Sequence, residues 1–314
     1  MIKTEQYDRK MQALVSTHDF ISELKNKENN SFLENLDYSS LVKNSKFQGE
    51  ILQFLDMTLG TFIFLDLEKK LSELQIKYIS KNLATILRIE ADYCIETNRI
   101  RILKNKISRI YHELFHAMTS FRLNETTNGC GFYQKINSLY IGSLLDEGYT
   151  DLLTYRYFED EINYNSEANL ALKLELILGQ EQMTRMYSTN DLLTLILFLA
   201  KYSSIENAIT FLENFDRLDE CRLSGKRTCE IVNIESNYLI DVYLNMLSHK
   251  YINGEIDRVE IKRQLESFKE NFNKFLFEDS SQDRIYTSSA DYIDIISKLQ
   301  TNNFQKVLFN TLSN

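Results

Sequence analysis

Two histidines four residues apart, His112 and His116, form the part of the chain whose spacing most directly indicates chemistry. The segment around them has a helical pattern, and residues four apart on a helix project to the same side, so both imidazoles can bind one metal ion. Glu113 diverges from this pair and can reach a water molecule held by the metal, as a general base does. Since the chain has only four histidines, chance is a poor explanation of the pattern.

A helix that carries such a site must be anchored to a core. Apolar side chains recur here at intervals of three and four, which buries the other face of the helix and fixes the histidines in place. These side chains are Ile107, Ile110, Tyr111, Leu114, Phe115 and Met118.

Two imidazoles and a water leave a catalytic zinc one protein ligand short. Glu147 and Asp151 lie further along the chain, one helical turn apart, and therefore share a face of a second predicted helix. Glu147 is expected to be the third ligand. Asp151 is expected to accept the free ring N–H of His112 and so to hold the orientation of that ligand.

The pattern H-E-x-x-H followed by E-x-x-x-D resembles the gluzincin family, the thermolysin-like zinc metallopeptidases. The resemblance covers roughly residues 95–160 and implies a zincin-like core and a zinc ion held by His112, His116 and Glu147. His-Glu-Leu-(apolar)-His-Ala also resembles the light chains of clostridial neurotoxins. Families that add a third histidine soon after the motif are excluded, because residues 117–248 contain none.

The resemblance implies a zinc-dependent hydrolase that cleaves peptide bonds, with an endopeptidase expected over an aminopeptidase. The metal would polarise the scissile carbonyl while Glu113 moves the proton. The developing oxyanion needs a hydrogen-bond donor, for which Tyr187 is preferred. The other candidates are Tyr149, Tyr155, Arg156, Arg185 and His249. A strand at Arg99, Ile100, Arg101 and Ile102 is expected to bind substrate by strand addition.

Two other functions stay open beside the peptidase. One is a zinc-stabilised regulatory or binding protein with a closed or inactive site, and Glu113 argues against it because a structural zinc does not need an adjacent carboxylate. The other is an effector or toxin protease.

Composition limits the partners and the compartment. A net charge of −9 argues against nucleic acid and anionic membrane surfaces, which require basic patches, so the expected partner is a peptide or protein substrate. The oligomeric state is left open. The first residues are charged and form no apolar signal segment, and the four cysteines lack metal-binding or disulfide-rich spacing. The sequence therefore predicts a cytoplasmic protein with free thiols.

The fold is expected to be α+β and predominantly α-helical, because the chain has no proline and only nine glycines. Three sections are predicted: a helical section at 1–82, a zincin core at 83–160 and a helical section at 161–314. Helical patterns cover 5–25 and 48–82, a hairpin is expected over 86–95 and 99–103, and 124–142 is expected to be a loop. Further helices are expected at 144–159, 167–187, 190–215, 230–252, 256–278 and 287–300, with a break at 222–227.

Overall fold

The computed structural model describes residues 2–28, 38–42, 45–87, 89–218 and 229–272. The chain divides into two compact units, one made of residues 1–168 with 180–195 and the other of residues 169–179 with 196–314. The predicted sections 1–82 and 83–160 thus fall together in the first unit. The helix predicted at 287–300 and the break predicted at 222–227 lie outside the described residues.

The protein is α+β and predominantly helical, as predicted. The helices are α1 (Ile2–Glu28), α2 (Tyr38–Leu41), α3 (Gln48–Thr58), α4 (Leu67–Glu73), α5 (Lys81–Leu87), α6 (Ile110–Thr119), α7 (Ser143–Phe158), α8 (Asn165–Leu178), α9 (Gln180–Ser188), α10 (Leu192–Lys201), α11 (Ile205–Asp216), α13 (Cys229–Ile252) and α14 (Arg258–Phe272). Short 3-10 turns lie at η2 (Ser45–Phe47), η3 (Ile95–Thr97) and η4 (Ile107–Arg109). Within the described part, none of the helices combines the length and apolar character needed to span a bilayer.

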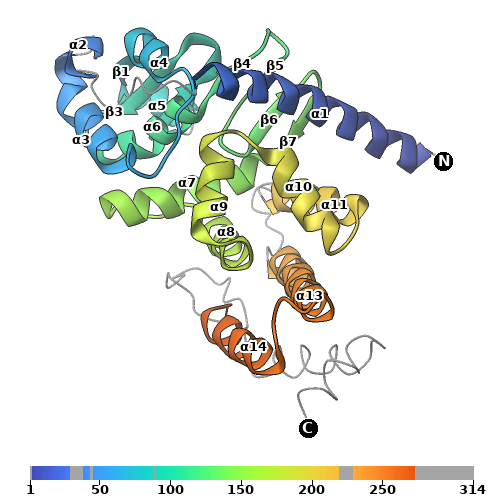
Figure 1. Ribbon diagram of the computed structural model, residues 1–314. Helices are drawn as coiled ribbons and strands as arrows, with labels where there is room; N and C mark the ends of the chain where they lie inside the picture. The colour runs from blue at the N-terminus through green and yellow to red at the C-terminus, as the bar shows by residue number, and fades with distance from the viewer. Residues whose placement is uncertain (1, 29–37, 43–44, 88, 219–228, 273–314) are drawn as a thin grey trace. The chain divides into compact units, whose positions relative to one another are not determined.

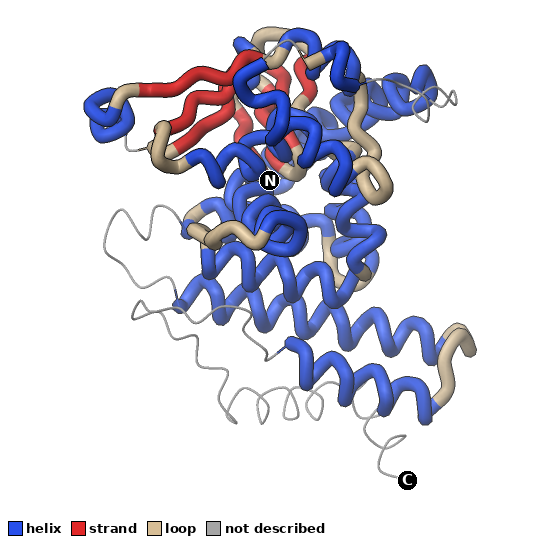
Figure 2. The backbone as a smooth tube through the Cα atoms, turned by 90° about the vertical axis from the view of Figure 1, so that its left-hand side faces the viewer, coloured by secondary structure: helices blue, strands red, loops and turns tan. Residues whose placement is uncertain are grey.

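The first unit contains a three-stranded sheet (Figures 1 and 2). Its strand order is β1-β3-β2. Its strands are β1 (Gln75–Ile79), β2 (Ala91–Cys94) and β3 (Arg99–Leu103). β2 and β3 form the predicted antiparallel hairpin, while β1 runs parallel to β3. The helical pattern predicted for 48–82 is therefore wrong at β1, and the strand predicted over 86–95 begins only after α5. The parallel pairing requires a crossover between β1 and β3, and α5 and β2 supply it.

A second sheet, which the sequence did not indicate, lies between α6 and α7 in the chain. Its antiparallel strands β4 (Phe121–Arg122), β5 (Thr127–Cys130), β6 (Tyr133–Ile136) and β7 (Leu139–Ile141) are paired in chain order. They are two to four residues long, and β5, β6 and β7 lie in the region 124–142 that was expected to be a loop. Strands this short, with polar residues and glycine, give no clear alternation of apolar and polar residues.

Helix α6 is the centre of the first unit. It contacts β2, β3, β5, α3, α4, α7 and α9, so it is surrounded by other elements. Every residue of α6 except Tyr111 is buried. Phe115 packs against the rings of Phe54 and Phe62 at centroid distances of 4.9 and 5.3 Å. A helix buried on nearly all sides holds its side chains in fixed positions, as a ligand site requires.

The described residues of the second unit are mainly helical, and α13 contacts both α11 and α14. Tyr243 of α13 stacks on Phe268 of α14 with 3.8 Å between centroids, and Phe211 of α11 lies 5.2 Å from Tyr238. Glu235 is 1% exposed in this helical packing. Its Oε1 accepts a hydrogen bond of 2.8 Å from Asn214 Nδ2, but its Oε2 is buried and makes no hydrogen bond within the described part of the chain.

Replacing Glu235 by Gln tests the cost of this buried acid. Burial raises the pKa of Glu235 to about 7, although the bond from Asn214 lowers it. The folded carboxyl therefore holds its proton to a higher pH than the unfolded one, and stability falls as the pH rises from about 4.5 to 7. Glu235→Gln should raise the free energy of unfolding by about 1–3 kcal/mol at pH 8 and much less at pH 5.

Urea unfolding at the two pH values measures this difference. The exposed Glu266→Gln on α14 is the control and should change little at either pH. An equal effect of Glu235→Gln at both pH values would contradict the conclusion that ionisation of the buried Glu235 carboxyl lowers stability.

Candidate metal centre

His112 and His116 lie one turn apart on α6 and are each 6% exposed. Their ring centroids are 4.7 Å apart and their Nε2 atoms face each other at 3.0 Å. The spacing in the sequence therefore translates into two nitrogen atoms aimed at one point.

Helix α7 brings Glu147 to the same point. Its Oε2 lies 3.1 Å from His112 Nε2 and 3.7 Å from His116 Nε2. A tetrahedral zinc ion with ligands roughly 2.0–2.1 Å away separates neighbouring ligand atoms by roughly 3.3 Å. The three measured separations bracket this value, so the triad can accept a small metal ion without a large rearrangement.

A carboxylate faces the other ring nitrogen of each histidine. His112 Nδ1 lies 2.8 Å from Asp151 Oδ1, and His116 Nδ1 lies 3.1 Å from Asp146 Oδ2. Both contacts are close enough for ion pairs, but neither has hydrogen-bond geometry. The hydrogen-bond contact of His116 Nδ1 is with Cys130 Sγ, at 3.7 Å. Each carboxylate favours a proton on the Nδ1 that it faces, which leaves both Nε2 atoms as electron-pair donors.

The histidine partner that sequence reasoning missed is Asp146. It is the remaining carboxylate in the segment Leu144–Leu153, and the second histidine also needs an acceptor for its ring N–H. The need of His116 for such an acceptor could have indicated Asp146 from the sequence. The residue was overlooked because it does not share the helix face of Asp151.

The electrostatics of the cluster favour positive charge. Burial lowers the pKa of His112, but the contacts with Asp151 and Glu147 outweigh it and raise the pKa to about 10. Burial likewise opposes ionisation of Glu147, yet the histidines hold its pKa well below the usual range. Three carboxylates surround two imidazoles here, so either protons or a cation must balance the charge.

Glu113 lies on α6 beside the ligand triad and is 7% exposed. It does not belong to the set of residues whose ligand atoms converge. Burial raises its pKa to about 7, while the neighbouring histidines act in the opposite direction. The residue is thus a buried acid close to the triad and outside it.

Tyr187 on α9 does not face an open site. It is fully buried, its ring packs 5.3 Å from that of Tyr149, and its hydroxyl is 2.7 Å from Thr150 Oγ1. Tyr164, which sequence reasoning did not single out, is closer to the triad: its ring centroid lies 6.5 Å from that of His112. The charge of Glu147 and burial raise the pKa of Tyr164.

The prediction that Arg99, Ile100, Arg101 and Ile102 bind a peptide by strand addition is wrong. These residues belong to β3, the central strand of its sheet, and pair with β1 on one side and β2 on the other. Both backbone edges are therefore occupied, whereas strand addition needs a free edge.

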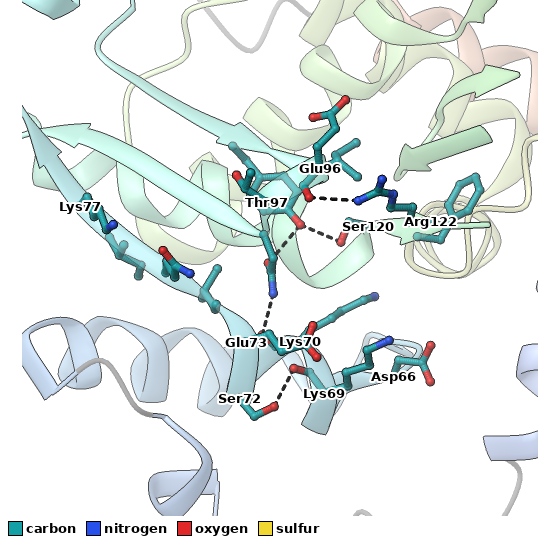
Figure 3. A pocket seen from close by; sticks show the side chains of 17 residues that line it. Asp66, Lys69, Lys70, Ser72, Glu73, Lys77, Glu96, Thr97, Ser120 and Arg122 are labelled. Atoms are coloured by element: carbon teal, nitrogen blue, oxygen red, sulfur yellow. Dashed lines mark hydrogen bonds between the residues drawn. The ribbon is translucent and has the colours of Figure 1, made fainter. Parts of the chain in front are cut away.

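An open pocket of about 920 Å³ lies elsewhere in the first unit (Figure 3). None of the triad residues lines it. The Tyr93 hydroxyl lies within hydrogen-bond distance of both Asn98 Oδ1 and Ser120 Oγ at its wall, and Arg122 donates to the carbonyl of Glu96. Polar groups of this wall are thus paired with one another, and the pocket is separate from the metal centre.

The chain is similar to an uncharacterized serpin-like protein of Acanthamoeba polyphaga mimivirus, with 23% identity over 247 residues. The alignment covers 77% of this chain and 56% of that protein, so the chain spans about half the length of the relative. No protein-family model matches the chain, and neither does any solved structure.

This likeness contradicts the assignment to the thermolysin-like peptidases. The predictions of a zinc-dependent endopeptidase and of peptide hydrolysis through Glu113 are contradicted by the same finding, and the two alternative functions gain no support from it. The physical reason is that the resemblance is local, because it covers only about residues 95–160. A short motif of this kind does not determine function, because similar sites occur on unrelated folds with different functions.

Gly148 allows α7, the helix that carries Glu147, to pack closely against the start of α8. A Cβ atom at this position would overlap the backbone and the Cβ of Glu167. Gly148→Ala should therefore lower the free energy of unfolding by about 1–3 kcal/mol, because the backbone of residue 167 cannot yield as a flexible side chain would. Urea unfolding followed by circular dichroism measures the change.

Gly49→Ala on α3 is the matched control, since a Cβ there meets no atom within 4 Å. It should be neutral or stabilising by up to roughly 0.5–1 kcal/mol. If both variants gave the same result, close packing at Gly148 would not be the cause.

Proposed function

We propose that the first unit of this protein binds a zinc ion through His112, His116 and Glu147. The observation that carries the proposal is the convergence of two Nε2 atoms and one carboxylate oxygen, with separations of 3.0, 3.1 and 3.7 Å. Two histidines and a glutamate are a known ligand set for zinc. A fourth position is left for water or another ligand.

The donor set favours zinc over hard cations. Mg²⁺ and Ca²⁺ prefer oxygen ligands and six or more of them, whereas imidazole nitrogen suits Zn²⁺ and neighbouring transition metals. The charges of the surrounding carboxylates also favour a divalent cation at this position. Asp146, Glu147 and Asp151 carry three negative charges around the neutral rings, and a divalent ion would offset two of them without a proton on either Nε2.

A zinc ion would connect α6 to α7. His112 and His116 come from α6, and Glu147 comes from α7 after the whole second sheet, so the metal would close a long segment of chain. An ion that binds the folded form alone also stabilises it, by about 2.7 kcal/mol when its free concentration is one hundred times Kd.

Zinc binding is tested with His112→Ala and a matched histidine control. The wild type should retain one equivalent of zinc after equilibration and gel filtration, measured by inductively coupled plasma mass spectrometry, and a chelator should lower its melting temperature. His112→Ala should lose the metal and the chelator effect. His18→Ala should keep both, because His18 contacts Asp191, outside the triad.

Wild-type protein that retains no zinc, or His112→Ala protein that retains a full equivalent, would contradict the proposal. Loss of zinc from both histidine variants would point to general unfolding, and circular dichroism would detect it.

We also infer that the partner of this chain is a protein. The support is the serpin-like relative, since a serpin-like protein would interact with proteases. A protease is therefore the class of partner to test first. This proposal is independent of the metal.

Serine, cysteine, aspartic and metalloproteases, each incubated with the chain, provide the test. At least one should lose activity on a small reporter substrate and co-elute with the chain in gel filtration. A heat-unfolded sample of the same chain is the control for simple competition by a cleavable substrate. If every protease class kept full activity and eluted alone, the protease partner would be rejected.

A further inference from the structure

We propose that Asp146 is a positioning residue for the metal centre, which holds His116 in the orientation that presents Nε2 to the ion. The inference rests on the proposed zinc site and deepens it. Asp146 is 2% exposed, and its Oδ2 lies 3.1 Å from His116 Nδ1. A carboxylate at this distance fixes which ring nitrogen carries the proton and so leaves the other one for the metal.

Asp146 is itself held by a turn of the second sheet. Its Oδ1 accepts a hydrogen bond of 2.9 Å from the backbone N–H of Phe132, and its Oδ2 accepts one of 3.3 Å from the thiol of Cys130. The carboxylate is therefore contacted on both oxygens and cannot turn away from His116 without losing buried partners.

Gly131 lets this turn reach the carboxylate. Its φ of +49° is in the left-handed region, and a Cβ atom there would overlap Asp146 Oδ1 and the ring of Tyr187. The N–H of Gly131 donates a hydrogen bond of 3.0 Å to Thr119 Oγ1, on the helix that carries the histidines. The turn at residues 130–132 thus connects α6 to α7 directly behind His116.

Asp151 has the same arrangement behind His112. Its Oδ1 contacts the ring, and its Oδ2 accepts two backbone hydrogen bonds of 2.7 Å, from Asn163 and Tyr164. Helix α7 therefore supplies one carboxylate behind each histidine, with Glu147 facing both Nε2 atoms. The backbone of a nearby segment donates hydrogen bonds to Asp146 and to Asp151, so both carboxylates are held in place behind the histidine rings.

His116, Cys130 and Asp146 could alternatively bind a metal themselves, because their ligand atoms also converge. Geometry favours the supporting role. His116 Nε2 faces His112 and Glu147, so a second ion on Nδ1 would require a doubly deprotonated, bridging ring. The two arrangements differ in whether sulfur touches the metal, and cobalt substitution can distinguish them.

The test compares Asp146→Asn with Asp191→Asn. The asparagine is isosteric and keeps an acceptor but loses the charge. The control removes a carboxylate that also faces a histidine Nδ1, that of His18, at 3.1 Å and outside the centre. Zinc affinity is measured by competition with a chromophoric chelator. Asp146→Asn should weaken it about 10- to 100-fold and alter the visible d–d bands of the Co²⁺ form, whereas Asp191→Asn should change neither.

Unchanged affinity and unchanged cobalt bands in Asp146→Asn would overturn the inference and leave the zinc site intact, provided that Glu147→Ala loses the metal. Absence of zinc from the wild type would instead overturn the proposed function. A sulfur-to-cobalt charge-transfer band in the wild type would show that Cys130 is a ligand and would also reject the supporting role.

A measurement on the wild type covers the case in which Asp146→Asn does not fold. Long-range ¹H–¹⁵N spectra of the zinc-loaded protein should show His116 coordinated through Nε2, with a slowly exchanging proton on Nδ1. Coordination through Nδ1 would contradict the role of Asp146.

Discussion

Charge balance around two buried imidazoles is the constraint on which the first unit depends. His112 and His116 face each other through Nε2, and carboxylates occupy the opposite side of each ring. Burying charged groups in a protein interior costs several kcal/mol for each ion unless partners satisfy them. In this cluster a carboxylate lies behind each ring, and each of these carboxylates accepts hydrogen bonds from the backbone of a neighbouring segment. Removing any one of these groups would leave another buried without a partner, so the cluster behaves as a single network.

The surrounding fold explains how such a network can be held in place. Nearly every side of α6 is covered, which fixes the directions of the two rings. Helix α7 carries the three acidic side chains of the network at positions 146, 147 and 151, and it packs closely against α8 because Gly148 has no side chain to meet Glu167. The second sheet, between α6 and α7 in the chain, then returns a turn to Asp146. The short strands of that sheet thus support the site from behind, and the three-stranded sheet packs on α6 through β2 and β3.

The parts that the sequence predicted are those with strong local periodicity. The helix around His112, the second helix with Glu147 and Asp151, and the β2–β3 hairpin each follow from spacing within one element.

Asp146 lies on a different face of its helix from Asp151, and only the tertiary contact with His116 reveals its position. The second sheet has strands too short for an alternating pattern, and β1 lies in a stretch whose apolar spacing also fits a helix. Gly179, with a φ of +89°, divides a predicted helix into α8 and α9, because one left-handed residue ends a helix without changing the apolar pattern on either side.

The spacing of residues within single helices did not predict the class of reaction correctly, and the reason is physical. A ligand set is decided by a few atoms at distances set by coordination chemistry, and these atoms lie on two helices. A reaction also depends on the groups around the open coordination position and on how a substrate reaches it. In this protein, Tyr187 is sealed in the core and β3 has no free edge, so two elements expected to meet a substrate do not do so. The likeness to a serpin-like protein extends over 247 residues, far more than the segment that carries the candidate metal ligands. That likeness covers most of the chain, whereas the converging side chains lie on only two helices, so a local ligand set does not determine what the rest of the protein does.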